Sequence, residues 1–360
     1  MCIGPAARAE QYVVAIGKGL TGLMSFVGVP ETNGIRLAAE QLEARHFLGE
    51  GNHIELRVFD DAGDRNQLMT LVSKAATLDN ALMFLGPASS GVASAVSPMV
   101  NELKMPMMAP AIATEPLKYG PWYMKITTSP EGSIRPVGRY AVDKMRVKRP
   151  AIVFCRDNDG HITNARTFRE IVTAAGLKVA ADETVLTSDT DFTAVATKIA
   201  AADPDSIFVA ANDVQAANIV TQLKQAGVGQ NVAIFGSSGL GTNYIKSGGP
   251  LVDNTYVSTD YNSAGTSPMN LAFQKDYRER FGLAPDNWSA VGYSEMLITA
   301  QAIKNAQPAP TRAKVLEAIQ AMRDVSVLLG AGTWSMGPDR IPLYEMQIVK
   351  VQNGTIVPAP

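Results

Sequence analysis

From Tyr12 onward, apolar runs of strand length alternate with segments of helical periodicity. The first series contains YVVAIG, IELRVFD, ALMFLG, PMMAPA and WYMKI, with helices expected at 31–48, 65–78 and 90–103. The second contains PAIVFC, KVAADETV, SIFVAA, VAIFGS and TYVSTD, with helices expected at 164–175, 192–201 and 214–226. Such alternation is typical of parallel βαβ units. Two similar series therefore predict an α/β protein with two doubly wound lobes.

The final third of the chain breaks this pattern. Helices are expected at 268–281, 288–305 and 312–322, followed by terminal strands around GTWSM and EMQIVKV. An open parallel sheet needs helices on both faces, and neither series supplies enough of them. We therefore expect the chain to return to the first lobe after Asp260 and to add its last strand to the second. The predicted domains are 10–126 plus 260–334, and 127–259 plus 335–360.

The segment GKGLTG follows the first strand and holds Gly17, Gly19 and Gly22 in G-x-G-x-x-G spacing. In a dinucleotide-binding turn the third glycine opens a helix whose free N–H groups hold the pyrophosphate. Here helical periodicity is expected to begin only near Glu31, after LMSFVGVPE. The loop is then too long for a phosphate turn, and a flexible crossover is favoured.

Composition narrows the possible partners. The chain has 360 residues, is 46% hydrophobic and 18% charged, and carries a formal net charge of −2. Without a cluster of Lys and Arg it has little to attract nucleic acid or an anionic bilayer. After the N-terminus, no run of about 18 apolar residues could span a membrane. Cys2 and Cys155 are the only thiols, so neither a disulfide framework nor a cysteine metal site is predicted.

The N-terminus leaves two interpretations open. Ala7-Arg8-Ala9 has the small-x-small pattern of a signal-peptidase site just before the first strand. The apolar segment that should precede such a site is missing. One interpretation is a start codon within a longer leader, and the other is an ordinary disordered tail.

No catalytic or metal-binding constellation is visible. His46, His53 and His161 stand apart without the spacing of a zinc site. An enzyme would show a nucleophile, a base and an orienting group, or a ligand cluster. We therefore predict no enzyme activity, no metal and no cofactor.

Two further segments resemble a calcium loop and a phosphate loop. Asp60, Asp61 and Asp64 in FDDAGDRNQ resemble a calcium loop but lack the EF-hand pattern and its closing Glu. They are interpreted as turn residues at a strand end, with Asp64 capping the following helix. GSSGLG at 236–241 has no following Lys-Ser/Thr, so a strand-end turn suffices there too.

Small hydroxyl and glycine residues follow two strands of the first lobe, in GPASSGVAS and APAIATEP. Ligands of open α/β sheets bind outside the carboxyl ends of the strands, so these residues should converge there: Ser89, Ser90, Ala111, Ala113 and Thr114. The helix that begins at Ser90 would direct its free N–H groups at the same place, which suits a carboxylate. Simple N-capping by Ser89 and Ser90 is an equal alternative.

The chain from about residue 11 resembles the type I periplasmic solute-binding proteins of ABC importers, in particular the branched-chain amino acid (Leu/Ile/Val) binding group. The resemblance is carried by GPASSGVASAVSPMVNELKMPMMAPAIATEPL, FDDAGDRNQ, AIVFCRDNDG and WSAVGYSEMLITAQAIKNA, in this order. It implies two Rossmann-like lobes joined by a three-crossing hinge, a ligand closed between the lobes, a periplasmic location and a membrane permease as partner. Phe26 matches the aromatic lip of the cleft.

The resemblance also implies roles for single residues of the first lobe. Ser90 matches the hydroxyl that binds the ligand carboxylate, and Ala111 matches a backbone donor or acceptor beside it. Ala113 stands where the family usually has Thr, so the hydroxyl could instead come from Thr114.

In the second lobe the match departs from the family pattern. Asp159 stands where an aromatic residue commonly closes the pocket, and Asn212 lies near another contributor. Ser238 stands where amino acid binders have the acid that pairs with the ligand ammonium. A desolvated ammonium without a partner costs several kcal/mol, so a small aromatic or aliphatic acid without an amine is predicted, its apolar body near Phe26. Asp159 or Asp213 could restore the charge, which keeps amino acids as the alternative.

Other functions of the same fold are weighed against transport. A cytoplasmic ligand sensor would gain support if no charged and apolar leader were encoded upstream of Met1. A repressor would need an N-terminal helix-turn-helix, and there is no room for one before Tyr12. The favoured function is a binding component whose ligand-closed form is recognised by a permease.

Overall fold

The computed structural model describes residues 10–237 and 240–360. The N-terminal Ala7-Arg8-Ala9 motif, Cys2 and Ser238 lie outside these residues. The chain forms two compact units. Unit 1 comprises Met1–Thr127, Ala272–Leu328 and Gly332–Leu343, and unit 2 comprises Thr128–Leu271, Leu329–Ala331 and Tyr344–Pro360. The predicted return to the first unit lies after Asp260, whereas in this division it follows Leu271.

The segment after Asp260 is bonded to residues of unit 2. Tyr261 donates its hydroxyl hydrogen to Asn270 Oδ1 at 2.5 Å, and the Asn270 side-chain amide donates to the carbonyl oxygen of Gly265 at 2.7 Å. These bonds close a loop within residues 261–270, all of which belong to unit 2 in this division.

Unit 1 contains a parallel five-stranded sheet in the order β2-β1-β3-β4-β5. Each predicted apolar run of the first series overlaps one of these strands, which are β1 Gln11–Lys18, β2 His53–Asp60, β3 Met83–Leu85, β4 Met107–Ala109 and β5 Tyr123–Lys125. A separate three-stranded sheet holds the predicted GTWSM strand, with β11 Val325–Ser326, β12 Thr333–Met336 and β13 Pro342–Leu343. The strand predictions for this unit are confirmed.

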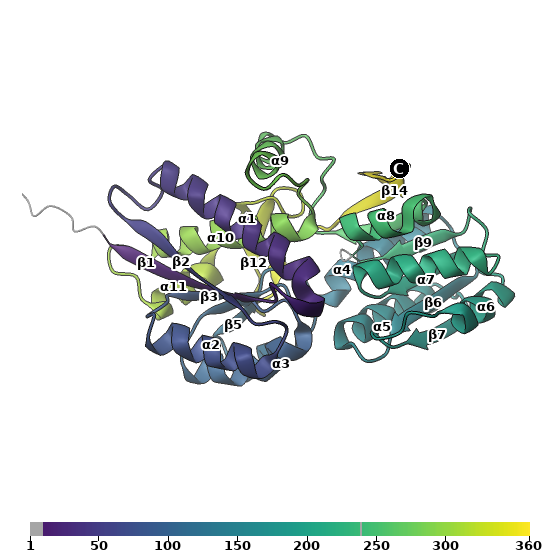
Figure 1. Cartoon of the computed structure of the whole chain (residues 1–360), viewed down its shortest axis with the longest axis horizontal. Coiled ribbons are helices and arrows are strands. Elements are labelled where there is room, and N and C mark those ends of the chain that lie inside the picture. Colours follow the sequence, from purple (N-terminus) through teal and green to yellow (C-terminus); the bar gives the residue numbers. More distant parts are fainter. Residues whose placement is uncertain (1–9, 238–239) are drawn as a thin grey trace, which may run out of the picture. The chain divides into compact units, whose positions relative to one another are not determined.

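Helices cover both faces of the five-stranded sheet (Figure 1). On one face lie α2 Arg65–Thr77 and α3 Ser90–Glu102, whose buried side chains form one core with Ala15, Phe84 and Met107. On the other lie α1 Ser25–Ala44 and α10 Asn287–Asn305. The remaining helices that lie wholly or mostly in this unit are η1 Gly22–Met24, η2 Glu115–Tyr119, α9 Pro268–Phe281 and α11 Arg312–Ala321.

Helix α1 begins earlier than the sequence predicts. It starts at Ser25 rather than near Glu31 and continues through Gly28 and Pro30. The reason is a close backbone contact, because a Cβ atom on Gly28 would lie 2.2 Å from the carbonyl oxygen of Gly19. Packing of the first turn against the strand-end loop overrides the weak local helix propensity of Gly and Pro.

Helices α1 and α10 approach each other until their backbones touch. A Cβ atom on Gly34 would lie 2.0 Å from the carbonyl oxygen of Ser289, and one on Gly292 would lie 2.1 Å from that of Glu31. No other residue type leaves this space. The two glycines therefore set the distance between the helices that cover this face of the sheet.

A fully buried charge cluster lies where these helices meet the end of β1. The Lys18 ammonium lies 2.8 Å from Glu31 Oε2 and 3.0 Å from Glu295 Oε2, and all three side chains are inaccessible to solvent. One cation thus faces two carboxyl groups. Burial raises the pKa of Glu31 to about 8 and also raises that of Glu295. We infer that one proton is held by this pair at neutral pH, so that the cluster carries no net charge.

Unit 2 contains a seven-stranded sheet in the order β15-β14-β10-β9-β8-β6-β7. Its strands are β6 Pro150–Cys155, β7 Ala181–Val185, β8 Ser206–Ala210, β9 Ala233–Gly236, β10 Thr255–Thr259, β14 Gln347–Gln352 and β15 Thr355–Pro358. The predicted EMQIVKV strand is β14, which pairs antiparallel with β10. The expected addition of the last run to the second sheet is confirmed.

Helices also cover both faces of this sheet. Side chains of α4 Pro130–Arg139 and α5 Asp159–Ala174 pack on one face, and those of α6 Thr193–Ala201, α7 Asp213–Gln225 and α8 Thr242–Gly248 pack on the other. Short helical turns at Tyr140–Lys144 and Gly249–Val252 complete the unit. In the part of the chain that the structure describes, no helix is long and apolar enough to cross a bilayer.

We expect Gly292→Ala to destabilise unit 1 by about 1–3 kcal/mol, the usual cost of overpacking. The added methyl group would meet backbone atoms of Glu31, which cannot rotate away. Gly91→Ala is the matched control, because a Cβ atom there meets nothing within 4 Å. Thermal unfolding should show a loss for Gly292→Ala alone; equal midpoints for both variants would contradict the close contact.

The Glu31 carboxyl group should make stability fall as pH rises. In the unfolded chain its pKa is near 4.5 and in the folded protein about 8, so between these values the folded state holds a proton that the unfolded state lacks. Its contribution to the free energy of unfolding is complete below pH 4.5 and is lost by about pH 8. The free energy of unfolding falls by no more than ~1.4 kcal/mol per pH unit in this range. Unfolding measured from pH 5 to 8.5 should show a shallower decline for Glu31→Gln than for wild type. Exposed Glu279→Gln is the control, and a wild-type slope in Glu31→Gln would show that the proton is held elsewhere.

Candidate functional site

The predicted residues of the first lobe lie at the carboxyl edge of the unit 1 sheet. Ser89 precedes α3 in an extended conformation, and its side chain makes no capping hydrogen bond. Ser90 is the first residue of α3, and its hydroxyl oxygen accepts a hydrogen bond from the backbone N–H of Ala113 at 3.1 Å. Simple N-capping is therefore the wrong account of both serines. The structure brings the start of α3 and the segment after β4 together, as the sequence predicts.

The segment after β4 is fixed through its carbonyl oxygens. That of Ala109 accepts from the Ile126 N–H at 3.1 Å, and that of Pro110 accepts from the Thr127 hydroxyl at 3.2 Å. The carbonyl oxygens of the next two residues, Ala111 and Ile112, both accept hydrogen bonds from the ammonium group of Lys125.

Lys125 is a functional candidate that the sequence analysis missed. It is the last residue of β5 and is fully buried. The available signal was its position, because a lysine at the end of the apolar run WYMKI is out of place in a buried strand.

The structure links Thr114 and Phe26 less closely to the residues around Ser90 and the segment after β4. Thr114 is exposed and precedes η2, and its hydroxyl makes no capping bond. Phe26 lies half-buried in the first turn of α1. Leu23 and Val29 flank it and are 82% and 39% exposed. The roles of Thr114 and Phe26 remain predictions.

The prediction that the loop after β1 is too long for a phosphate turn is wrong. The helical turn η1 begins at Gly22, the third glycine of the motif. The structure supplies a different reason. The Asp60 carboxylate accepts hydrogen bonds from the N–H groups of Leu20 and Thr21 at 2.8 and 3.3 Å, and from the Thr21 hydroxyl at 2.7 Å. These bonds, the Thr21 hydroxyl first, hold the pKa of Asp60 below its usual value. An ionised carboxylate of the protein thus occupies the donors that a phosphate would need.

Asp64 caps α2 by accepting from the Gln67 N–H at 2.8 Å, as predicted.

In unit 2 the structure places Asp159 and Asn212 at the ends of neighbouring parallel strands, β6 and β8. Asp159 is the exposed first residue of α5. Asn212 precedes α7, and its side chain makes no capping bond. Both residues therefore lie at the same edge of the sheet. Ser238 lies outside the described residues.

Asp213 already has a structural role. It is 4% exposed, and its carboxylate accepts from the N–H groups of Gly241 and Tyr244 at 3.1 and 2.7 Å. It therefore holds the start of α8. Of the two acids proposed to replace the missing charge, only Asp159 is exposed.

Burial alters the pKa of two further reactive side chains, His161 and Cys155. Burial lowers the pKa of His161 to about 4, so this imidazole is neutral at physiological pH. Burial raises the pKa of the Cys155 thiol to about 12, which makes the residue unreactive. Among the described residues, no group of three or more His, Cys, Asp or Glu side chains could hold a metal ion.

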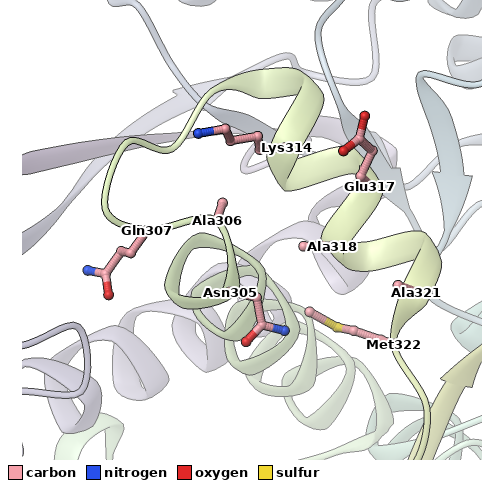
Figure 2. A pocket seen from close by; sticks show the side chains of 8 residues that line it. All are labelled: Asn305, Ala306, Gln307, Lys314, Glu317, Ala318, Ala321 and Met322. Carbon is pink, nitrogen blue, oxygen red and sulfur yellow. The ribbon is translucent and has the colours of Figure 1, made fainter.

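Two hollows in the surface of unit 1 lie away from the predicted ligand residues. One, of about 450 Å³, lies between the end of α10 and α11, where Asn305, Lys314, Glu317 and Met322 line it (Figure 2). The other, of about 460 Å³, is lined by α2 and by Met99 of α3. Neither is lined by Ser90 or Ala113.

Comparison with known proteins identifies the family and the fold. Residues 12–355 match the family model described as periplasmic binding protein. The chain belongs to the periplasmic binding protein family. This family and its structural neighbours are substrate-binding proteins rather than enzymes. The recognition made from the sequence motifs is confirmed.

Among relatives of this periplasmic binding protein is the Leu/Ile/Val-binding protein BraC3 of Rhizobium johnstonii. It is 24% identical over 362 residues, covering 100% of this chain and 96% of the relative. The leucine-, isoleucine-, valine-, threonine- and alanine-binding protein of Pseudomonas aeruginosa is 23% identical, with 87% and 83% covered.

Solved structures show the same fold. LivJ of Streptococcus pneumoniae, in complex with isoleucine, superposes with a TM-score of 0.87 at 21% identity, covering 96% of this chain and 97% of that one. A solute-binding protein of R. palustris, in complex with benzoate, superposes with a TM-score of 0.85 at 19% identity, covering 97% and 95%. The predicted fold class, two Rossmann-like lobes of the type I periplasmic binding protein fold, is confirmed.

Proposed function

We propose that this chain is the extracytoplasmic, periplasmic solute-binding component of an ABC uptake transporter and that its ligand is a small aromatic or short aliphatic carboxylate without an α-ammonium group. A membrane permease would be its partner, and closure of the two units on the ligand would shift a pre-existing equilibrium. The observation that carries the proposal is the hydrogen bond between Ser90 and Ala113. It joins the start of α3 to the segment after β4 at one edge of the sheet.

This edge of unit 1 suits an anion. The first N–H groups of a helix have no partner within the helix and carry the positive end of its dipole. The hydroxyl groups of Ser89 and Ser90 lie at the start of α3 and are only half-buried. Hydrogen bonds from such donors to a carboxylate are charge-assisted and roughly twice as strong as neutral ones.

Two positions of unit 2 bear on whether it can bind an ammonium group. The sequence has Ser238 rather than an acid at the position that the resemblance assigns to ammonium binding, and Asp213 is engaged at the start of α8. A zwitterionic ligand would therefore have its carboxylate bound and its ammonium desolvated without a counter-charge, which is costly.

Amino acid binding is the second candidate. It is favoured by the names of the relatives, several of which are described as Leu/Ile/Val-binding proteins. Asp159 is the acid of this chain that would have to serve such a ligand, because it is exposed near the edge of unit 2.

A panel of matched ligands tests the choice. L-leucine and 4-methylpentanoate differ only in the amine, as do L-phenylalanine and 3-phenylpropanoate, and benzoate completes the set. We expect the acids without an amine to raise the unfolding midpoint, since a ligand at ~100 times its Kd adds ~2.7 kcal/mol of stability. Calorimetric binding of L-leucine with no response to any of the three acids would refute the proposed ligand class.

Ser90→Ala should weaken binding of the best acid about tenfold or more, or ~1.4 kcal/mol, because it removes both a donor to the ligand and the acceptor that holds Ala113. Ser94→Ala is the matched control, with the same change one turn later in α3. Titration calorimetry on both variants provides the measurement. Equal affinities would show that the carboxylate binds elsewhere.

A further inference from the structure

The chain passes between unit 1 and unit 2 at a small number of points, which we call crossings. They lie at Thr127–Thr128, at Leu271–Ala272, at Leu343–Tyr344 and on either side of residues 329–331. A hinge is a small set of residues that absorb changes in backbone dihedral angles. Closure of the two units would therefore have to bend the chain at these crossings.

The last crossing brings a tyrosine to the end of β10. Tyr344 follows β13, and its hydroxyl group donates to Asp260 Oδ1 at 2.6 Å. The sheet explains this contact, because β10 and β14 pair antiparallel with Thr259 opposite Gln347. The residue after β10 thus meets the residues before β14. Burial raises the pKa of Tyr344 well above its usual value, so the hydroxyl group keeps its proton and remains a donor.

The same hydroxyl group holds the first crossing. The N–H of Thr128, with which unit 2 begins, donates to Tyr344 Oη at 3.3 Å. One residue earlier the chain is fixed within unit 1, because the Thr127 hydroxyl donates to the carbonyl oxygen of Pro110 at 3.2 Å. The chain therefore passes from a bond of unit 1 to a bond of unit 2 within one peptide unit.

A third part of the chain is bonded at the same place. Residues 329–331 belong to unit 2, although the chain on either side of them belongs to unit 1. The Gly330 N–H donates to the carbonyl oxygen of Asp260 at 2.7 Å. Gly330 has a φ of 58°, and a Cβ atom there would lie 2.8 Å from the carbonyl oxygen of Glu345 and 2.9 Å from Cδ2 of Tyr344. This turn therefore packs directly on the tyrosine ring.

Bonds within unit 1 fix the residues next to these crossings. The Leu328 N–H donates to the Ser294 hydroxyl oxygen at 3.2 Å, and Leu343 is paired with Ser335 of β12. Each of these crossings thus has a bonded residue on its unit 1 side and a bonded residue on its unit 2 side. Few backbone dihedral angles are left between the two.

We propose that Tyr344 is a hinge clamp, a positioning residue that holds three of the crossings together so that they move with unit 2 as one body. Bending during closure is then confined to 127–128, 328–330 and 343–344. The proposal rests on the proposed function, because it concerns closure on a ligand. It adds the residue that determines where the chain bends.

Two pairs of variants test the clamp. Tyr344→Phe removes the hydroxyl group and keeps the ring. Tyr140→Phe is its control, since the Tyr140 hydroxyl also donates within unit 2, to the carbonyl oxygen of Pro360 at 2.9 Å. Gly330→Ala displaces the turn from the tyrosine ring. Gly354→Ala is its control, because Gly354 has a φ of 68° and a Cβ atom there meets nothing within 4 Å.

Two measurements on the ligand-free protein provide the readout. Amide hydrogen exchange detected by NMR follows the N–H group of Thr128. Pulsed electron spin resonance gives the distribution of distances between nitroxide labels on two exposed positions, Thr70→Cys in α2 and Thr197→Cys in α6, in a Cys2→Ser background. Titration calorimetry with L-leucine and 4-methylpentanoate then gives the Kd of whichever ligand binds more tightly.

We expect the Thr128 amide to exchange at least tenfold faster in Tyr344→Phe, because its acceptor is gone. A general loss of stability would instead speed exchange throughout unit 2. The distance distribution should broaden in Tyr344→Phe and Gly330→Ala and keep its wild-type width in both controls. A broader ensemble contains less of the state that closes on the ligand, so the Kd should rise about fivefold in Tyr344→Phe.

The outcomes separate the clamp from the proposed function. A wild-type distance distribution or a wild-type Kd in Tyr344→Phe would overturn the clamp and leave the proposed function standing. If L-leucine binds to the wild type and 4-methylpentanoate does not, the proposed ligand class fails, whereas the distance distributions still decide the clamp. If Tyr344→Phe does not fold, Gly330→Ala decides it against Gly354→Ala by the same two criteria.

Discussion

The carboxyl edge of the unit 1 sheet depends on how the chain leaves β4. Carbonyl oxygens of four consecutive residues, Ala109–Ile112, accept hydrogen bonds from three consecutive residues, Lys125–Thr127. Buried carbonyl groups must be paired, and the end of β5 pairs them all on one side. On the other side, where α3 begins, the Ala113 N–H donates to the Ser90 hydroxyl oxygen. The same segment is thus held by β5 through its carbonyl groups and by α3 through an N–H group.

Two buried lysines at this edge have different structural roles. Lys18 at the end of β1 is neutralised by Glu31 and Glu295, which join the strand to α1 and α10. Its field is cancelled within the core, so it can contribute stability and helix position but little attraction for a ligand. The Lys125 ammonium donates to the backbone carbonyl groups of Ala111 and Ile112 and so fixes the segment after β4.

Local features of the sequence predicted much of the fold, and contacts between distant segments account for what it missed. Strand runs, the start of α3 at Ser90 and the cap at Asp64 depend on neighbouring residues, so a pattern in the sequence reveals them. The early start of α1 depends on Gly28 meeting Gly19, and the occupied loop amides depend on Asp60. Lys125 and Ala111 are paired only because β5 lies beside β4, which the sequence order alone does not show.

The ligand class has to be decided by a few charged groups, because the fold admits several. Proteins of this fold at about one-fifth identity are described with isoleucine and with benzoate, and both ligands have a carboxylate and an apolar body. What distinguishes them is the ammonium group. A site discriminates strongly when one ligand leaves a buried polar group unpaired. Under the proposed function, the acid Asp213 is bonded to the start of α8, so the unpaired group would be the ammonium of an amino acid.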